Sequence, residues 1–152
     1  MNDKQAIYFD CFAGISGDMI LGALVNLGVD IKIIRKDLNK INLKGYKLTS
    51  HLVKRNGITG TKVNVVIDPS IKYRNQARSF IDIKKLIDKS SLSQKVRTDS
   101  IEIFRRIGTV EAEIHGTSLD KIHFHEIGAI DSIVDIVGGA ICMSLLNIDI
   151  VF

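Results

Sequence analysis

Apolar residues recur along the chain with two different periodicities. Between Tyr46 and Ile67 apolar side chains recur at every second position on both sides of Asn56-Gly57, a dipeptide preferred in tight two-residue turns. This pattern predicts an antiparallel β-hairpin with one solvated face. The run from Ala6 to Phe9 is apolar without polar alternation, which is typical of a strand covered on both faces, so we expect an interior strand there.

Elsewhere the apolar residues lie three and four positions apart, which predicts amphipathic helices. A long helix is expected from about Ser93 to His115, and a last helix from about Ala129 to Leu146 should lie at the centre of the domain. The apolar stripe of the long helix is expected at Ile103, Phe104, Ile107, Val110 and Ile114. Further helices are expected to begin near Ser16, Asp30 and Asp82. Together these elements predict an α+β fold, a single domain with a mixed β-sheet that includes the antiparallel hairpin and is packed by several helices.

Composition restricts the class of protein. A chain of 152 residues with 45% apolar content can bury one core, so residues 1–152 are expected to form one domain. The formal charge of +4 comes from scattered Lys and Arg with few aromatic neighbours, which argues against nucleic acid and favours small anionic substrates. Two distant cysteines indicate a reducing, cytoplasmic setting, and no apolar run is long enough for a bilayer. The apolar segment Ile148–Phe152 at the end of the chain indicates a fragment of a longer protein that forms homo-oligomers.

The side chains best suited to metal chemistry occur just before and within the last helix. In an extended segment His123 and His125 would share one face, and at the helix start Asp131 and Asp135 are one turn apart on the same side. Glu126 directly follows His125 in the sequence. Imidazole nitrogens suit transition-metal ions, whereas carboxylates suit hard divalent cations or can orient an imidazole ring. A buried, hydrogen-bonded polar network is the alternative interpretation of this cluster.

A second polar segment follows the first predicted strand. Asp10 stands at the carboxyl end of that strand, where open α/β sheets bind ligands. The loop through Gly14 leads to Ser16, a suitable N-cap, and to Gly17 and Asp18 in the first helical turn. Backbone amides at this helix start could hold an anionic group, and a tight strand-to-helix turn is the alternative.

Four segments of the chain resemble the LarC family of nickel insertion proteins, namely Tyr8–Met19, Asn56–Gly60, Glu111–Gly116 and His123–Gly138. The resemblance covers essentially the whole chain. It implies that the parent protein places nickel into pyridinium bisthiocarboxylic acid mononucleotide, giving the nickel-pincer cofactor of lactate racemase and related enzymes. It also implies that the reaction consumes CTP with Mg²⁺ or Mn²⁺, and that the CTP site lies in a C-terminal portion beyond this chain.

The resemblance also implies a set of site residues. Asp10, Asp18 and Glu126 are expected to be catalytic, and Gly14, Ser16 and Gly17 to bind the organic substrate. The expected metal ligands are His115, His123, His125, Asp131 and Asp135. Two other functions remain open, a nickel carrier or assembly module without chemistry of its own and a metal-dependent phosphohydrolase.

Overall fold

The computed structural model describes residues 4–70, 78–124 and 127–152. The helices are α1 (Gly17–Asn26), α2 (Ile31–Leu38), α3 (Phe80–Asp88), α4 (Gln94–Ile114) and α5 (Ile130–Leu145), with short 3₁₀ turns η1 (Asn39–Ile41) and η2 (Leu119–Lys121). The strands are β1 (Gln5–Ile7), β2 (Tyr46–Arg55), β3 (Ile58–Ile67), β4 (Arg78–Ser79), β5 (His123–Phe124) and β6 (Ile148–Val151). In this part of the chain no helix is both long and apolar enough to cross a membrane.

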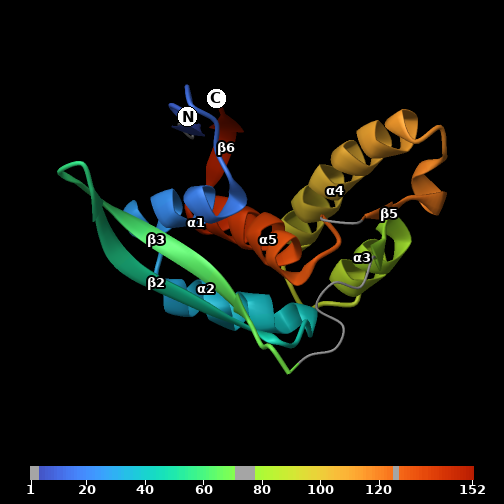
Figure 1. The fold of residues 1–152 in the computed structure, drawn as a ribbon, viewed down its shortest axis with the longest axis horizontal. Coiled ribbons are helices and arrows are strands. Elements are labelled where there is room, and N and C mark those ends of the chain that lie inside the picture. Colours follow the sequence, from blue (N-terminus) through green and yellow to red (C-terminus); the bar gives the residue numbers. More distant parts are fainter. Residues whose placement is uncertain (1–3, 71–77, 125–126) are drawn as a thin grey trace.

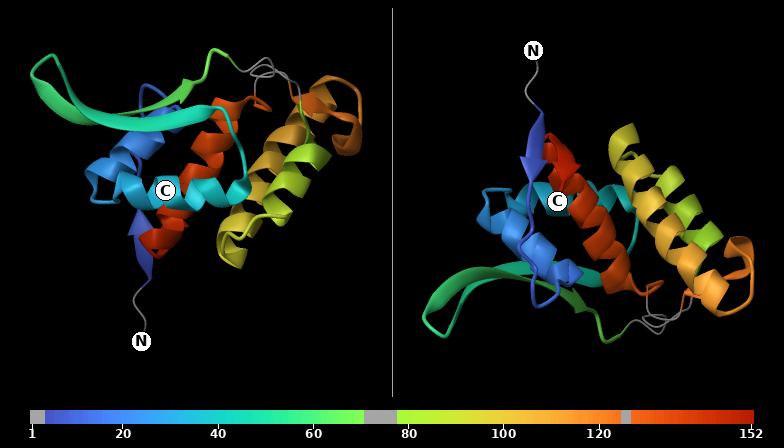
Figure 2. Two further views of the ribbon diagram at one scale, coloured as in Figure 1. Left: turned by 90° about the horizontal axis from the view of Figure 1, so that it is seen from below. Right: turned by 90° about the horizontal axis from the view of Figure 1, so that it is seen from above.

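Helix α5 is the central element, as the sequence predicts. It packs against α1 and α2 on one side and against α4 on the other (Figure 1). The β2–β3 hairpin lies along α1, while α3 packs on α4 (Figure 2). Because both sides of α5 face other helices, its buried residues include the small residues Gly138, Ala140 and Cys142 as well as large aliphatic ones.

The predicted hairpin is confirmed over its whole length. Its ladder runs without a break from the Tyr46–Ile67 pair to the pair beside the turn. Asn56 and Gly57 have φ angles of 48° and 85°, so both turn residues adopt the left-handed conformation that a type I′ turn requires. Leu48 and Val63 are buried on the face that meets the helices, which leaves the opposite face to solvent.

The prediction of an interior first strand is wrong. Strand β1 pairs in parallel only with β6 among the described residues, and Gln5 and Ala6 are exposed. The α+β class is confirmed, but the parallel and antiparallel pairs form separate two-stranded sheets rather than one mixed sheet. A short apolar run does not specify how many neighbours a strand has, because pairing depends on segments far away in sequence.

Local signals place most helix ends correctly. The Asp30 carboxylate accepts a hydrogen bond from the Lys32 amide at 2.8 Å and caps α2, and Gly28 after α1 has a φ of 118°. Helix α3 begins earlier than expected, because Ser79 is its N-cap and forms a reciprocal capping box with Asp82.

The predicted stripe of α4 is only partly right. Ile103, Val110 and Ile114 are exposed, whereas the buried row advances four residues at a time through Val96, Ser100, Phe104, Gly108 and Ala112. A Cβ atom at Gly108 would lie 2.9 Å from the Phe124 ring, so the β5 segment packs directly over this row. The neighbouring elements therefore select a face that includes small and polar residues, which apolar periodicity could not identify.

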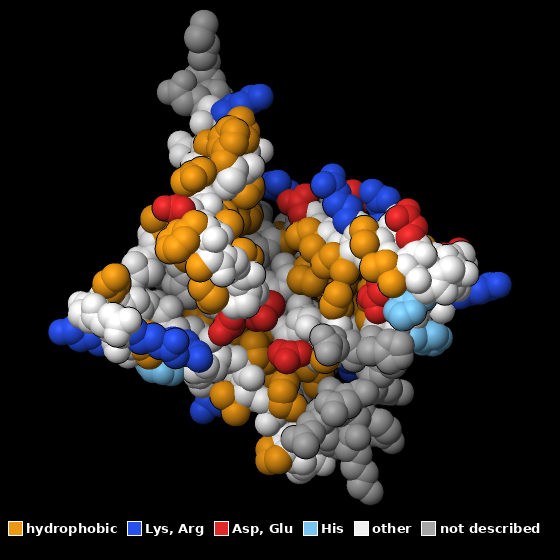
Figure 3. Space-filling view, turned by 45° about the horizontal axis from the view of Figure 1, so that its top comes forward, with side chains coloured by type: hydrophobic (Ala, Val, Ile, Leu, Met, Phe, Trp, Pro, Cys, Tyr) orange, Lys and Arg blue, Asp and Glu red, His pale blue; other side chains and the backbone are white. Residues whose placement is uncertain are grey.

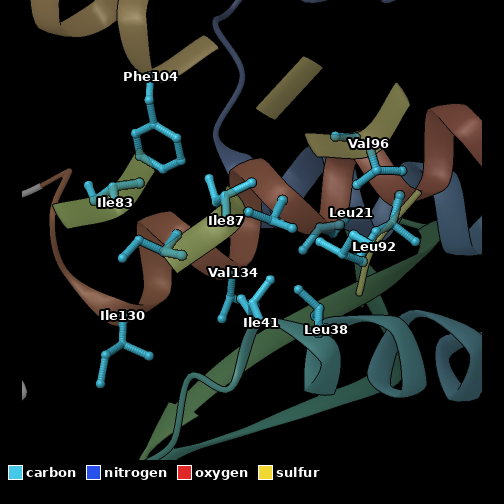
Figure 4. Close-up of a cluster of buried hydrophobic side chains, with 14 of the residues drawn as sticks. Leu21, Leu38, Ile41, Ile83, Ile87, Leu92, Val96, Phe104, Ile130 and Val134 are labelled. Carbon is cyan, nitrogen blue, oxygen red and sulfur yellow. The ribbon is translucent and has the colours of Figure 1, made fainter. Parts of the chain in front are cut away.

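The core joins all the helices. Figure 4 shows Leu21, Leu38, Ile87, Phe104 and Val134 converging from α1, α2, α3, α4 and α5. Each of these side chains is fully buried. Burial of apolar surface stabilises a fold by about 25 cal/mol per Å². The shared cluster therefore holds α1, α4 and α5, which surround the candidate site, in fixed positions relative to one another.

Candidate functional site

The loop between β1 and α1 forms a tight turn. The Gly14 amide donates a hydrogen bond to the Cys11 carbonyl oxygen at 2.8 Å, and Gly14 has a φ of 88°. Its N–H group is therefore occupied by the turn. Ser16 is the N-cap residue of α1, as the sequence predicts, but its hydroxyl donates to the Asp18 carboxylate instead of capping a backbone amide.

The first turn of α1 packs closely on α5. A Cβ atom at Gly17 would lie 2.5 Å from the Asp135 Cβ and 2.6 Å from its Oδ2, so only glycine leaves room for this carboxylate. This contact brings together the two polar segments that stand apart in the sequence, the loop after β1 and the start of α5.

Two other carboxylates, Asp18 and Asp131, lie near enough to Asp135 to affect its titration. Burial, with smaller contributions from these two carboxylates, raises the pKa of Asp135 to about 7. Oδ1 of Asp135 is buried and has no hydrogen-bond partner in the described residues. Asp135 therefore exists in both protonation states near neutral pH, and its charged form lacks a counter-ion in that part of the chain.

Asp135 and Gly17 border an apolar groove of about 580 Å³ between α1, α4, α5 and the β1–β6 pair. Figure 3 shows acidic side chains at the centre of this face, between two bodies of hydrophobic side chains. Apolar lining residues include Phe9, Ile15, Ile103, Met143 and Phe152. The volume lies within the range of small-molecule sites, and apolar walls with a few polar groups are typical of such sites.

Two further features shape the groove. Gly139 of α5 lines it, and a Cβ atom there would have no neighbour within 4 Å, so the helix backbone is open to a ligand. On the α4 side Lys95 and Asp99 form an ion pair at 3.0 Å, which neutralises the charge of that wall. Asp135 is therefore the main unpaired charge among the described lining residues, apart from Asp149, whose carboxylate accepts the Gln5 amide at 2.9 Å.

Among the described residues, the expected metal ligands are not brought together in one place. His115 is the exposed C-cap of α4, and His123 is exposed on β5. The pKa of Asp82 is lowered mainly by its hydrogen bonds with Ser79, and nearby His123 makes a small contribution. His125 and Glu126 lie outside the described residues. Within the described residues no group of three or more His, Cys, Asp or Glu side chains is arranged to hold a metal ion.

The remaining predicted residues divide between the groove and its surroundings. Gly17 and Asp135 line the groove, Ser16 and Asp18 line a neighbouring cavity on the hairpin side of α1, and Asp10 and Gly14 line neither. The sequence reasoning missed the apolar walls. The sequence pattern places Ile103 on the apolar stripe of α4, and no sequence signal separates it from the core, because packing against neighbouring elements decides which row of α4 is buried.

Comparisons with known proteins identify nickel insertion proteins as similar to this chain. A family model described as "Nickel insertion protein" matches residues 7–152. A protein of Acetivibrio thermocellus named "Pyridinium-3,5-bisthiocarboxylic acid mononucleotide nickel insertion protein" is 46% identical over 153 residues, covering 97% of this chain and 38% of the relative. A "Putative nickel insertion protein" of Dictyoglomus thermophilum is 44% identical over 148 residues, covering 97% of this chain and 37% of the relative. The chain thus spans a little over a third of the length of these curated relatives. No solved structure matches.

Proposed function

The chain belongs to the nickel insertion protein family, and we propose that it is the N-terminal part of a protein that places nickel into pyridinium-3,5-bisthiocarboxylic acid mononucleotide. The observation that carries this proposal is the contact between Gly17 and Asp135. It joins two of the four segments that resemble the family beside an apolar groove, and it includes a carboxylate oxygen without a hydrogen-bond partner among the described residues.

The groove suits the organic substrate named by the relatives. Its apolar walls can take a flat pyridinium ring, and Asp135 with Asp18 and Asp131 provides negative charge for the ring cation and for the incoming nickel ion. Nickel is a substrate in this reaction, so the protein needs to hold it only until the sulfur atoms of the thiocarboxylates share in its coordination.

Asp135 has a second suitable property. When a carbon–nickel bond forms at a ring carbon, the proton on that carbon has to leave. A carboxylate with a pKa of about 7 is suited to accept such a proton near neutral pH. Asp135 also lines the groove in which the ring is proposed to bind. We therefore propose Asp135 as a proton acceptor while it is not bound to nickel, because a bound metal ion would lower its pKa.

The other assignments remain part of the proposal. Ser16 and Gly17 position the organic substrate, with Gly14 shaping the loop, and Asp10 and Asp18 assist the reaction. Glu126 is proposed as a catalytic group. The proposed nickel ligands are His115, His123, His125, Asp131 and Asp135, with the histidines forming a first docking place for the ion.

The proposal assigns CTP and its Mg²⁺ or Mn²⁺ to the C-terminal portion of the same protein. The described residues offer no group of three side chains arranged to hold a metal ion. The protein is proposed to act in the cytoplasm, where an exposed Cys11 and a buried Cys142 would stay reduced, and to form homo-oligomers.

The test uses the full-length protein with nickel, CTP, Mg²⁺ or Mn²⁺ and the mononucleotide, and mass spectrometry follows the gain of nickel by the mononucleotide. Asp135→Asn should slow this gain by about 100-fold or more, because it removes the proton acceptor without changing the size of the side chain. Glu113→Gln, which removes an exposed carboxylate of α4 outside the groove, is the matched control and should have little effect.

Other outcomes identify other functions. Nickel binding without any change in the mononucleotide would indicate a carrier or assembly module, and release of phosphate from the mononucleotide would indicate a phosphohydrolase. Equal rates for the Asp135→Asn protein and the parent would show that the groove carboxylate is not part of the site.

A further inference from the structure

A second cavity, of about 400 Å³, lies where α2 and η1 lead into β2. The left panel of Figure 2 shows this connection between the end of α2 and the hairpin. Among the described residues, the cavity shares no lining residue with the apolar groove, and no predicted site residue lines it. A ligand in this cavity would therefore contact other described residues than a ligand in the groove.

Arg35 is the one lining cation of this cavity for which a hydrogen bond is found among the described residues. It stands in the last turn of α2, and its Nε atom donates a hydrogen bond at 2.8 Å to the carbonyl oxygen of Leu48 on β2. This partly buried bond links the helix to the strand and holds the plane of the guanidinium group. Within the described residues no hydrogen bond or ion pair engages its two Nη atoms. A fixed fork of N–H donors is thus left for a ligand.

Two more cations stand at the same cavity. Lys44 and Lys47 are exposed lining residues, and neither forms an ion pair in the part of the chain that the structure describes. No carboxylate is among the lining residues. The nearby acid Asp37 is paired with Lys40 at 2.6 Å. Lys44 and Lys47 lie at the exposed rim of the cavity, and their positive charges together with that of Arg35 favour an anion with two or more negative charges.

The other lining residues of the cavity indicate a ligand larger than an inorganic anion. The Asn39 side chain offers amide donors and an acceptor, and Leu43 and Tyr46 contribute partly buried apolar surface. A volume of about 400 Å³ exceeds what one inorganic anion fills and is within the range of small organic ligands. The lining therefore combines an anion-binding end with a wall for a small polar or apolar group.

We propose that this cavity binds a small phosphorylated metabolite. In this arrangement Arg35 donates two N–H groups to two phosphate oxygens, and Lys44 and Lys47 neutralise the second charge. A phosphate monoester fits better than a single carboxylate, because three cations match a dianion and the guanidinium fork matches two oxygens of one phosphate group. The organic part of the ligand rests on Leu43 and Tyr46.

The test is calorimetry on the full-length protein with ribose 5-phosphate as the probe, at physiological salt. We expect ribose 5-phosphate to bind more tightly than inorganic phosphate, and ribose alone not to bind. The double variant Lys44→Ala/Lys47→Ala should weaken binding by about tenfold or more. Both lysines are exposed, so this variant should fold normally. The matched control is Lys32→Ala/Lys54→Ala, which removes two exposed lysines elsewhere and should bind as the parent does.

Arg35→Lys adds a second measurement, since it keeps the charge but loses the fork, and it should also weaken binding about tenfold. Ribose 5-phosphate binding that survives the Lys44→Ala/Lys47→Ala change would belong to another site and would overturn the proposal. So would an absence of binding, or equal affinity for ribose 5-phosphate and inorganic phosphate. A short duplex RNA that binds more tightly through the same lysines would overturn it in favour of a nucleic-acid surface.

Discussion

Replacing Asp135 with asparagine should change how the stability of the chain depends on pH. The substitution keeps the shape of the side chain that fits against Gly17 and removes its charge. In the folded chain burial raises the pKa of Asp135 from its ordinary value of 3.8 to about 7, with smaller contributions from the carboxylates of Asp18 and Asp131.

The direction follows from proton linkage. Because the folded state holds its proton up to a higher pH than the unfolded state, the free energy of unfolding falls as pH rises between about 4 and 7. A shift from 3.8 to about 7 corresponds to a ceiling of about 4 kcal/mol. The side chain keeps partial contact with water, and screening reduces the expected loss to about 1–2 kcal/mol. This loss is absent from the Asp135→Asn variant.

The measurement is urea unfolding followed by circular dichroism, at several pH values between 4 and 8. The variant should match the parent near pH 4 and exceed its free energy of unfolding by about 1–2 kcal/mol at pH 8. Glu113→Gln, which removes an exposed carboxylate from α4, should show no such divergence. A difference between variant and parent that stays constant with pH, or that favours the parent at pH 8, would refute the assignment of a buried, unpartnered carboxylate.

Three further changes test other parts of the structure. Gly17→Ala should lower the free energy of unfolding by about 1–3 kcal/mol, because its Cβ would overlap Asp135, whereas Gly139→Ala faces open space and should be neutral or slightly stabilising in thermal melts. Changing His123 and His125 to alanine together should abolish nickel binding in calorimetry and leave the circular dichroism spectrum nearly unchanged. Nickel binding by that double variant equal to that of the parent would show that the site assignment is wrong. Light scattering should show association of the chain at high concentration that Phe152→Ser weakens, since this side chain is 67% exposed beside the edge of β6, and a strict monomer would contradict this.

The sequence alone was sufficient to predict those elements whose formation depends on a few adjacent residues. Asn56 and Gly57 specify the hairpin because both tolerate a positive φ, and Asp30 starts α2 because its carboxylate reaches a backbone amide two residues on. The spacing of Asp131 and Asp135 likewise placed two carboxylates at the start of α5. Such features are settled by local sterics and short-range hydrogen bonds, which a short stretch of sequence contains.

The tertiary structure decided what depends on packing between distant segments. The sequence does not show that Gly17 meets Asp135, that this contact buries an unpartnered oxygen, or that the groove beside it is walled by residues such as Ile103. The same holds for β1, whose apolar run predicted an interior strand but which pairs only with β6 in the described chain. Burial and electrostatic environment are properties of the assembled core, so the raised pKa of Asp135 appears only when α1 and α5 are packed together.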